Sequence, residues 1–324
     1  MSRFLTRTTL SVILTLMINP TFAGADSPST ATANANTPTA NSWPEVTLDN
    51  TRQFIIDSRQ TGRSYRILVA VPDSPVPEGG FPVVYSLDGN TTFPLWKVMA
   101  ERLQQRGQAR GALVVGITAA EGDKAQLVAR AEDYTPPAAN MDKTGDQSGS
   151  RQGGADRFLA FIEQELKPQI EQHFAINRHQ QTLFGHSYGG LFTLHTLFTH
   201  PESFQRYVAA SPSIWWNERY VLSERNGFAD RLAALAQPVT LMLTVGSEEQ
   251  TAPASMKAER VQMLQKRAQV DNVKQLFSDL QQTVAAESDG KLQLGLHIFP
   301  GENHMSAMPE AINRAVEFVY GGKP

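Results

Sequence analysis

The sequence of 324 residues contains no cysteine. This absence excludes a disulfide framework, a thiolate metal site and a cysteine nucleophile. A basic excess is also missing, because 32 Asp and Glu outnumber 29 Lys and Arg and give a formal net charge of -3. Nucleic-acid binding normally depends on a basic surface, so we expect no nucleic-acid partner. The chain lacks the H-E-x-x-H and P-loop patterns as well, and we expect neither a metal ion nor a cofactor.

No apolar run is long enough to span a bilayer. The N-terminal run Leu10–Met17 is short and is followed by Asn19 and Pro20, which argues against a membrane anchor. Basic residues precede this run, and Ala23-Gly24-Ala25 follow it. This order is typical of a secretory signal peptide cleaved after Ala23 or Ala25. We therefore assign residues 1–25 to a signal peptide and expect a periplasmic protein.

A change of composition follows the predicted cleavage site. Residues 26–42 are rich in Ala, Thr, Asn, Ser and Pro and have almost no large apolar side chain. Such a segment cannot bury enough surface to offset the entropy lost on ordering. We interpret it as a flexible linker and assign residues 43–324 to one catalytic domain.

The rest of the chain alternates between strand and helix patterns. Short apolar runs bounded by turn residues predict buried strands, whereas longer runs with helical spacing predict helices. The strands are expected at Arg66–Val71, Pro82–Leu87, Leu113–Ile117, Thr182–Phe184, Val239–Val245 and Leu292–Phe299, and the helices at Arg157–His173, Leu191–Phe198, Lys257–Ala285 and Ala307–Tyr320. This alternation predicts an α/β fold with a doubly wound, mainly parallel sheet and helices on both faces.

One segment, Glu121–Gly154, has neither period. It contains Pro136, Pro137 and several glycines. Because a long irregular insert in an α/β domain is often functional, we expect it to border the active site.

The pentapeptide Gly185-His186-Ser187-Tyr188-Gly189 matches the nucleophile-elbow pattern G-x-S-x-G. A predicted strand precedes it and a predicted helix follows it, as an elbow in the α/β-hydrolase fold requires. The sharp turn exposes the serine hydroxyl, and very small residues on either side avoid collisions with the backbone. Ser187 is therefore the candidate nucleophile.

A base and an acid are expected further along the chain, in that fold's order of serine, acid and histidine. His304 follows the last predicted strand, and none of the six other histidines has this placement. A neutral imidazole can take the proton of Ser187 and return it to the leaving group. The turn after Val239–Val245 contains Glu248 and Glu249. We prefer Glu249 as the acid that orients His304, with Glu248 or a Ser-His dyad as alternatives.

An oxyanion hole requires two backbone N–H groups directed at the developing negative charge. One is expected from Tyr188, the residue after the nucleophile. The other is expected from the loop after Pro82–Leu87, at Gly89 or Asn90. An ordinary Asp-Gly turn is the alternative explanation of that loop.

Five strings together resemble a known family: Leu-Asp-Gly-Asn (87–90), Gly-His-Ser-Tyr-Gly-Gly (185–190), Ser-Pro-Ser-Ile-Trp-Trp (211–216), Thr-Val-Gly-Ser-Glu-Glu (244–249) and Gly-Glu-Asn-His (301–304). The chain resembles esterases of the esterase D type, and within them the bacterial periplasmic siderophore esterases that open the trilactones of enterobactin and salmochelin. The resemblance implies hydrolysis of a catecholate siderophore, such as ferric enterobactin, and release of its iron. It also implies siderophore uptake components as further partners.

A catecholate siderophore is anionic and aromatic, so its site should offer guanidinium groups and ring faces. Arg130 is the first candidate for the guanidinium. Trp215 and Trp216 follow a predicted strand at the sheet edge where ligands bind in such folds, and we expect one to line the pocket and the other to pack. Two alternatives remain open: a general carboxylesterase of small acyl esters, and a protein that binds a siderophore without hydrolysing it.

Overall fold

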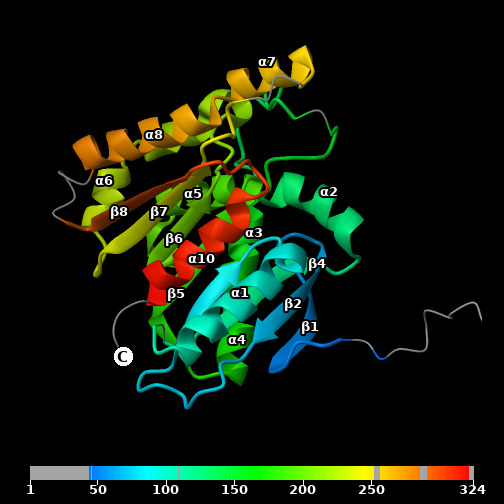
Figure 1. The fold of residues 1–324 in the computed structure, drawn as a ribbon, viewed down its shortest axis with the longest axis vertical. Coiled ribbons are helices and arrows are strands. Elements are labelled where there is room, and N and C mark those ends of the chain that lie inside the picture. Colours follow the sequence, from blue (N-terminus) through cyan, green and yellow to red (C-terminus); the bar gives the residue numbers. More distant parts are fainter. Residues whose placement is uncertain are drawn as a thin grey trace, which may run out of the picture. The chain divides into compact units, whose positions relative to one another are not determined.

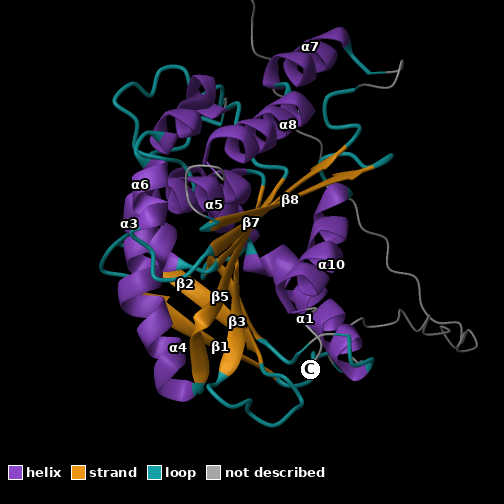
Figure 2. Cartoon of the chain, turned by 90° about the vertical axis from the view of Figure 1, so that its left-hand side faces the viewer, coloured by secondary structure: helices purple, strands orange, loops and turns teal. Residues whose placement is uncertain are grey.

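A mixed sheet of eight strands carries the fold, with helices on both of its faces (Figures 1 and 2). The computed structural model describes residue 44 and residues 46–108, 110–146, 148–251, 256–284 and 290–320. The described residues from Leu48 onward form one compact unit. The predicted signal peptide and linker, residues 1–42, lie outside the described residues.

The strand order in the sheet is β1-β2-β4-β3-β5-β6-β7-β8. β2 is antiparallel to both of its neighbours, and every later pair is parallel. β3 lies between β4 and β5 and is parallel to both, so the carboxyl ends of β3 and β5 lie beside each other at one edge of the sheet. The strands are β1 (Thr51–Asp57), β2 (Ser64–Ala70), β3 (Phe81–Ser86), β4 (Leu113–Ala119), β5 (Ile176–His186), β6 (Arg206–Ala210), β7 (Val239–Gly246) and β8 (Leu292–Phe299).

Helices connect the parallel strands. The α-helices are α1 (Gly89–Gln105), α2 (Asp123–Asp133), α3 (Ala155–Phe161), α4 (Lys167–His173), α5 (Tyr188–Thr199), α6 (Phe228–Ala233), α7 (Ala258–Arg267), α8 (Gln269–Asp279) and α10 (Ala307–Tyr320). Short π or 3₁₀ segments are η2 (Ile162–Leu166), η3 (Pro201–Ser203), η4 (Trp216–Arg225) and η5 (Leu280–Val284).

Each face of the sheet has its own apolar core. On one face α1 and α10 pack through residues that include Phe93, Trp96 and Ile312. On the other face α3, α5 and α8 contribute residues that include Phe158, Phe192 and Val273. Figure 2 shows the two groups of helices on opposite sides of the strands. This arrangement explains why β3 and β4 are buried at every position, as strands covered on both faces must be.

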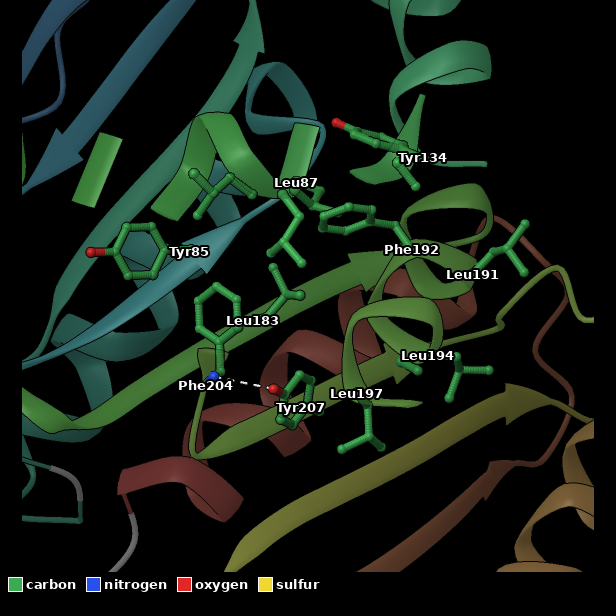
Figure 3. Close-up of a cluster of buried hydrophobic side chains, with 14 of the residues drawn as sticks. Tyr85, Leu87, Tyr134, Leu183, Leu191, Phe192, Leu194, Leu197, Phe204 and Tyr207 are labelled. Atoms are coloured by element: carbon green, nitrogen blue, oxygen red, sulfur yellow. Dashed lines mark hydrogen bonds between the residues drawn. The ribbon is translucent and has the colours of Figure 1, made fainter. Parts of the chain in front are cut away.

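A cluster of buried apolar side chains lies beneath α5. Leu191, Phe192, Leu194 and Leu197 of this helix pack over β3 and β5 (Figure 3). Phe204 and Tyr207 close the cluster, and the Tyr207 hydroxyl accepts the backbone N–H of Phe204 at 3.1 Å. All residues of α5 from Tyr188 to Phe198 are buried. The helix that follows Ser187, α5, is thus packed against the protein on all of its faces.

The structure confirms the fold class and corrects several predicted elements. β1 and α1 had not been predicted. The expectation that Glu121–Gly154 is irregular throughout is wrong, because α2 occupies its first part. Lys257–Ala285 was predicted as one helix, but Ala268 adopts a left-handed conformation (φ 46°) and separates α7 from α8. None of the described helices has the length and hydropathy that crossing a membrane requires.

Candidate active site

Ser187 lies at the turn between β5 and α5, with φ 61° and ψ -117°. This backbone conformation is strained for a residue with a side chain. Hydrogen bonds hold it, since the Ser187 N–H donates to the Ala210 carbonyl and the Ser187 carbonyl accepts from the N–H groups of Leu191 and Ser213. The turn therefore presents the Ser187 hydroxyl at the carboxyl edge of the sheet.

The glycines around Ser187 differ in how much space a side chain would have. A Cβ atom on Gly185 would lie 2.1 Å from the Gly189 carbonyl oxygen, and one on Gly190 would lie 2.8 Å from Pro212 Cα. A Cβ on Gly189 would lie 3.4 Å from Leu87 Cδ1, which is an ordinary contact. The steric need predicted for Gly185 is thus present, whereas on the other side of Ser187 it falls on Gly190 rather than Gly189.

His304 extends from the segment between β8 and α10 to the Ser187 hydroxyl. Its Nε2 lies 3.0 Å from Ser187 Oγ, and its Nδ1 lies 2.6 Å from Glu249 Oε2. The imidazole is 40% exposed, whereas the Glu249 side chain is 1% exposed. The histidine is thus oriented by a buried acid and is itself partly open to solvent.

Glu249 is the acid that contacts His304. Its other oxygen, Oε1, accepts hydrogen bonds from Ser211 Oγ at 2.5 Å and from the Gly246 N–H at 2.7 Å. Burial alone would raise the pKa of Glu249, but the hydrogen bond from His304 and these two donors outweigh burial and hold the pKa below its ordinary value. Glu249 is therefore ionised at neutral pH, and Glu248 is not in this position.

The turn after β3 lies against the nucleophile turn. Asp88 has a left-handed conformation (φ 52°) and precedes α1, and its Oδ2 is 3.7 Å from the position of a Cβ on Gly189. Gly89 and Asn90 are the first residues of α1, and Tyr188 is the first residue of α5. The N–H groups of a helix's first turn have no acceptor within the helix. The three predicted oxyanion donors are thus at helix starts beside Ser187.

Arg130 lies beside the same turn but is engaged by the protein itself. Its Nε and Nη2 donate to the two Asp88 carboxylate oxygens at 3.0 and 3.1 Å. Its guanidinium also lies 5.6 Å from the Tyr134 ring centroid and 5.5 Å from that of Tyr188. Gln126 donates to Asp88 and to the Tyr134 hydroxyl. Arg130 therefore fixes the turn after β3, with Nε and Nη2 both engaged by Asp88.

The two adjacent tryptophans differ in environment. Trp216 is completely buried and donates its indole N–H to Gln152 Oε1 at 2.8 Å. It packs, so it is not a residue that could contact a substrate. Trp215 is partly exposed, and its ring centroid lies 6.0 Å from that of Tyr188. Trp215 is thus the member of the pair that lies at the surface beside the nucleophile turn.

The irregular part of the segment after α2 borders the site. Asp146 Oδ2 accepts hydrogen bonds from the Tyr188 hydroxyl at 3.0 Å and from Gln152 at 2.7 Å. The Trp215 ring also lies 3.3 Å from the position that a Cβ on Gly145 would take. The expectation that this segment lies at the site agrees with these contacts.

Several contributing residues were missed in the sequence. His186 is buried against His304, with ring centroids 4.6 Å apart, and its Nε2 lies 2.8 Å from the His304 carbonyl oxygen. Burial, the neighbouring His304 and Arg130 lower the pKa of His186 to about 3, so it is neutral and can donate this bond. Ser211 and Ser213 contact Glu249 and Ser187. Their position after a strand and their place in the string Ser-Pro-Ser-Ile-Trp-Trp (211–216) were signals that could have found them.

This site stands on an α/β-hydrolase fold, and the chain is an esterase: it belongs to the family described as "Putative esterase", whose model matches residues 58–288. The matched region contains Ser187 and Glu249. Among the described residues, no group of three or more His, Asp or Glu could hold a metal ion.

Proteins of similar sequence and structure carry related names. The ferri-bacillibactin esterase BesA of Bacillus subtilis is 33% identical over 84% of this chain and 90% of its own. The siderophore enterobactin esterase of Emericella nidulans is 35% identical over 73% of this chain and 81% of its own. The crystal structure of the BES protein from Bacillus cereus has a TM-score of 0.72 and 32% identity, covering 86% of this chain and 97% of that one.

Proposed function

We propose that the protein is a periplasmic serine esterase that hydrolyses the trilactone ester bonds of a catecholate siderophore, such as ferric enterobactin, and thereby aids iron release. The observation that carries the proposal is the continuous hydrogen-bonded series of Ser187, His304 and Glu249. Nucleophile, base and orienting acid in this order are the arrangement by which serine hydrolases cleave esters.

In the first half of the reaction, His304 Nε2 takes the proton of Ser187 Oγ as this oxygen attacks the ester carbonyl carbon. The ionised Glu249 holds the imidazole by its Nδ1–H and stabilises the imidazolium. The tetrahedral intermediate then collapses as the C–O bond to the leaving alkoxide breaks. His304 Nε2–H protonates that oxygen, which leaves an acyl group on Ser187.

In the second half, His304 takes a proton from water, and the resulting hydroxide adds to the acyl carbon. Collapse of this intermediate breaks the bond to Ser187 Oγ, which recovers its proton from His304 and releases a carboxylic acid. In both halves the carbonyl oxygen becomes negative. The N–H of Tyr188 and that of Gly89 or Asn90 are the donors proposed to stabilise this charge.

The names of the relatives support the siderophore as substrate. Proteins named as esterases or hydrolases of siderophores share 31–35% identity with this chain over most of its length. A partly exposed tryptophan beside the nucleophile, Trp215, is suited to aromatic catechol rings. The aligned Ser187 and His304 favour hydrolysis over binding alone, since a protein that only binds would have no chemical need for this geometry.

The proposed location rests on the N-terminal order of basic, apolar and small residues. Cell fractionation with N-terminal sequencing tests it. A soluble envelope form that begins at Gly24 or Asp26 is expected. An uncleaved chain in the cytoplasm would contradict both the location and the assignment of residues 1–25.

Hydrolysis by the purified protein tests the activity, with ferric enterobactin and p-nitrophenyl butyrate compared side by side. A much higher kcat/KM on the trilactone is expected. Fast cleavage of the small ester without action on the trilactone would instead indicate a general carboxylesterase.

The variant Ser187→Ala tests the role of the nucleophile with both substrates. Removing a triad nucleophile is expected to lower kcat by at least about 10³-fold. Binding of ferric enterobactin, followed by quenching of tryptophan fluorescence, should persist, because the aromatic contacts remain. Residual hydrolysis above a few per cent of the parent rate would overturn the role of Ser187.

A further inference from the structure

Arg267 is a cation beside the active site that sequence reasoning did not single out. It is the last residue of α7, which precedes α8 in the chain (Figure 1). Its guanidinium carbon lies 3.9 Å from the centroid of the Trp215 ring. Within the described part of the chain no carboxylate lies in ion-pair distance of this guanidinium. A stacked guanidinium of this kind keeps its N–H donors available at the ring edge.

The backbone around Arg267 is held in place by buried contacts. The left-handed Ala268 ends α7, and its N–H donates to the carbonyls of Leu264 and Gln265. The buried Gln269 donates to the Pro212 carbonyl at 2.7 Å, and Asn272 Nδ2 donates to the Arg267 carbonyl at 2.8 Å. Pro212 lies in the turn that leads to Trp215. Arg267 and Trp215 are therefore fixed on elements that are bonded to each other.

The same turn connects this pair to the nucleophile. Ser213 lies two residues before Trp215, its Oγ is 3.4 Å from Ser187 Oγ, and its N–H donates to the Ser187 carbonyl at 3.1 Å. The Trp215 ring also neighbours that of Tyr188. A substrate whose ester reaches Ser187 would thus have its nearby substituents beside Trp215 and Arg267.

The electrostatic surroundings set Arg267 apart from Arg130. Arg130 gives its planar fork to Asp88, whereas partial burial lowers the pKa of Arg267, opposed by Tyr188 and Asp146 and reinforced by Arg260. Asp146, the nearby carboxylate, is already bonded by Tyr188 and Gln152. Arg267 remains charged at neutral pH, since a guanidinium keeps its proton even when its pKa is lowered. It is a partly desolvated positive charge that forms no ion pair with a carboxylate of the described residues.

We propose that Arg267 and Trp215 form a subsite for one metal-bound catecholate arm of the substrate, and that Arg267 makes the enzyme prefer the iron-loaded siderophore over the iron-free one. This inference rests on the proposed function. Three dianionic catecholates around one Fe³⁺ leave the complex negatively charged. A free phenolic hydroxyl titrates near 10, so the iron-free arms are mostly neutral at pH 7. The guanidinium distinguishes the two forms by charge, while the indole face accepts the ring of either.

The primary test is binding to the Ser187→Ala protein, in which ligand is not consumed. Ferric and iron-free enterobactin are titrated in turn, and Kd is obtained from the quenching of tryptophan fluorescence. Adding Arg267→Gln is expected to weaken ferric enterobactin about tenfold, as loss of a charge-assisted contact would, and the iron-free form by less than about threefold. Arg267→Lys keeps the charge but loses the planar stack, so an intermediate loss is expected.

Lys266→Gln is the matched control. Lys266 is exposed, carries the same charge and neighbours Arg267 on α7. It is expected to leave both Kd values within about twofold of the Ser187→Ala parent, because exposed charges are screened. An equal loss in Lys266→Gln, an equal loss for both ligand forms in Arg267→Gln, or no binding of either form to the parent would each overturn the subsite.

Turnover by the protein with Ser187 intact separates this inference from the proposed function. Hydrolysis of ferric enterobactin together with an unchanged ferric to iron-free ratio of kcat/KM in Arg267→Gln would remove the subsite and leave the function standing. Hydrolysis of p-nitrophenyl butyrate without hydrolysis of either enterobactin form would remove the proposed function itself.

Discussion

His304 and His195 both contact carboxylates, and their surroundings give them opposite properties. His304 has one carboxylate on Nδ1, a serine hydroxyl on Nε2 and a 40% exposed side chain. His195, in the middle of α5, has Glu224 on Nδ1, Asp156 on Nε2 and a 2% exposed side chain. In each case a glutamate on Nδ1 orients the ring. Only in His304 does the second nitrogen, Nε2, face a hydroxyl that it can deprotonate.

The electrostatic consequence is clear for His195. Burial would lower its pKa, but the hydrogen bonds and charges of Asp156 and Glu224 outweigh burial and raise the pKa to about 9. His195 is therefore a cation at neutral pH, and its ion pairs with Asp156 and Glu224 join α5 to α3 and η4. A carboxylate beside a histidine therefore indicates catalysis only when the other ring nitrogen faces a nucleophile.

Removing the acid from the His304 site should have the largest effect. Glu249→Gln replaces the acceptor of Nδ1–H with an amide, which no longer stabilises the imidazolium. We expect kcat to fall by about 10³ to 10⁴-fold with little change in KM, measured on p-nitrophenyl butyrate. A loss of less than about tenfold would mean that Ser187 and His304 act as a dyad.

Removing the cation from the other site should affect stability instead. His195→Gln leaves the buried Glu224 carboxylate without its charged partner, and we expect the free energy of unfolding to fall by about 3 kcal/mol. Urea denaturation measures this loss. At a temperature where the variant is folded, its kcat should equal that of the parent, because His195 does not face Ser187. A kcat loss that matches Glu249→Gln would break the comparison.

The titration of His195 should also make the free energy of unfolding depend on pH. The folded pKa of His195, about 9, lies above the ordinary histidine pKa of about 6.5. Its stabilisation, on the order of 3 kcal/mol, is therefore fully present below pH 6.5 and is lost as pH rises through about 9. Denaturation at pH 6 and pH 10 checks this, with His195→Gln as reference, since the difference between the two proteins should shrink at high pH. A difference independent of pH would contradict it.

The smallest predicted effect concerns His186, which donates a hydrogen bond to the backbone carbonyl of His304. His186→Leu removes the donor to the His304 carbonyl, so the segment that carries the base loses one restraint. We expect kcat to fall about tenfold at nearly constant KM, in line with the loss of one neutral hydrogen bond. His186→Gln supplies another N–H donor and should restore part of kcat. Equal losses in both variants would indicate packing alone.

The candidate triad could be predicted because the α/β-hydrolase fold repeats its order along the chain. Ser187, Glu249 and His304 each follow a strand that the apolar pattern reveals, and parallel strands bring their carboxyl ends to one edge. Their assembly is then a consequence of topology. Glu248 and Glu249 could not be separated with certainty, because which of two adjacent side chains faces the core depends on the backbone of one turn.

Other features were decided only by the tertiary structure. The separation of α7 from α8 lies at Ala268, which gives no breaker signal, and it places Arg267 over Trp215. Arg130 looked available for a ligand until its fork was found on Asp88, which is 42 residues away. The order of nucleophile, acid and base along the chain, and the strands that they follow, can be read from the sequence alone. Which charged and aromatic side chains pair with one another is known only from the tertiary structure. These contacts join segments far apart in the chain and follow no local period.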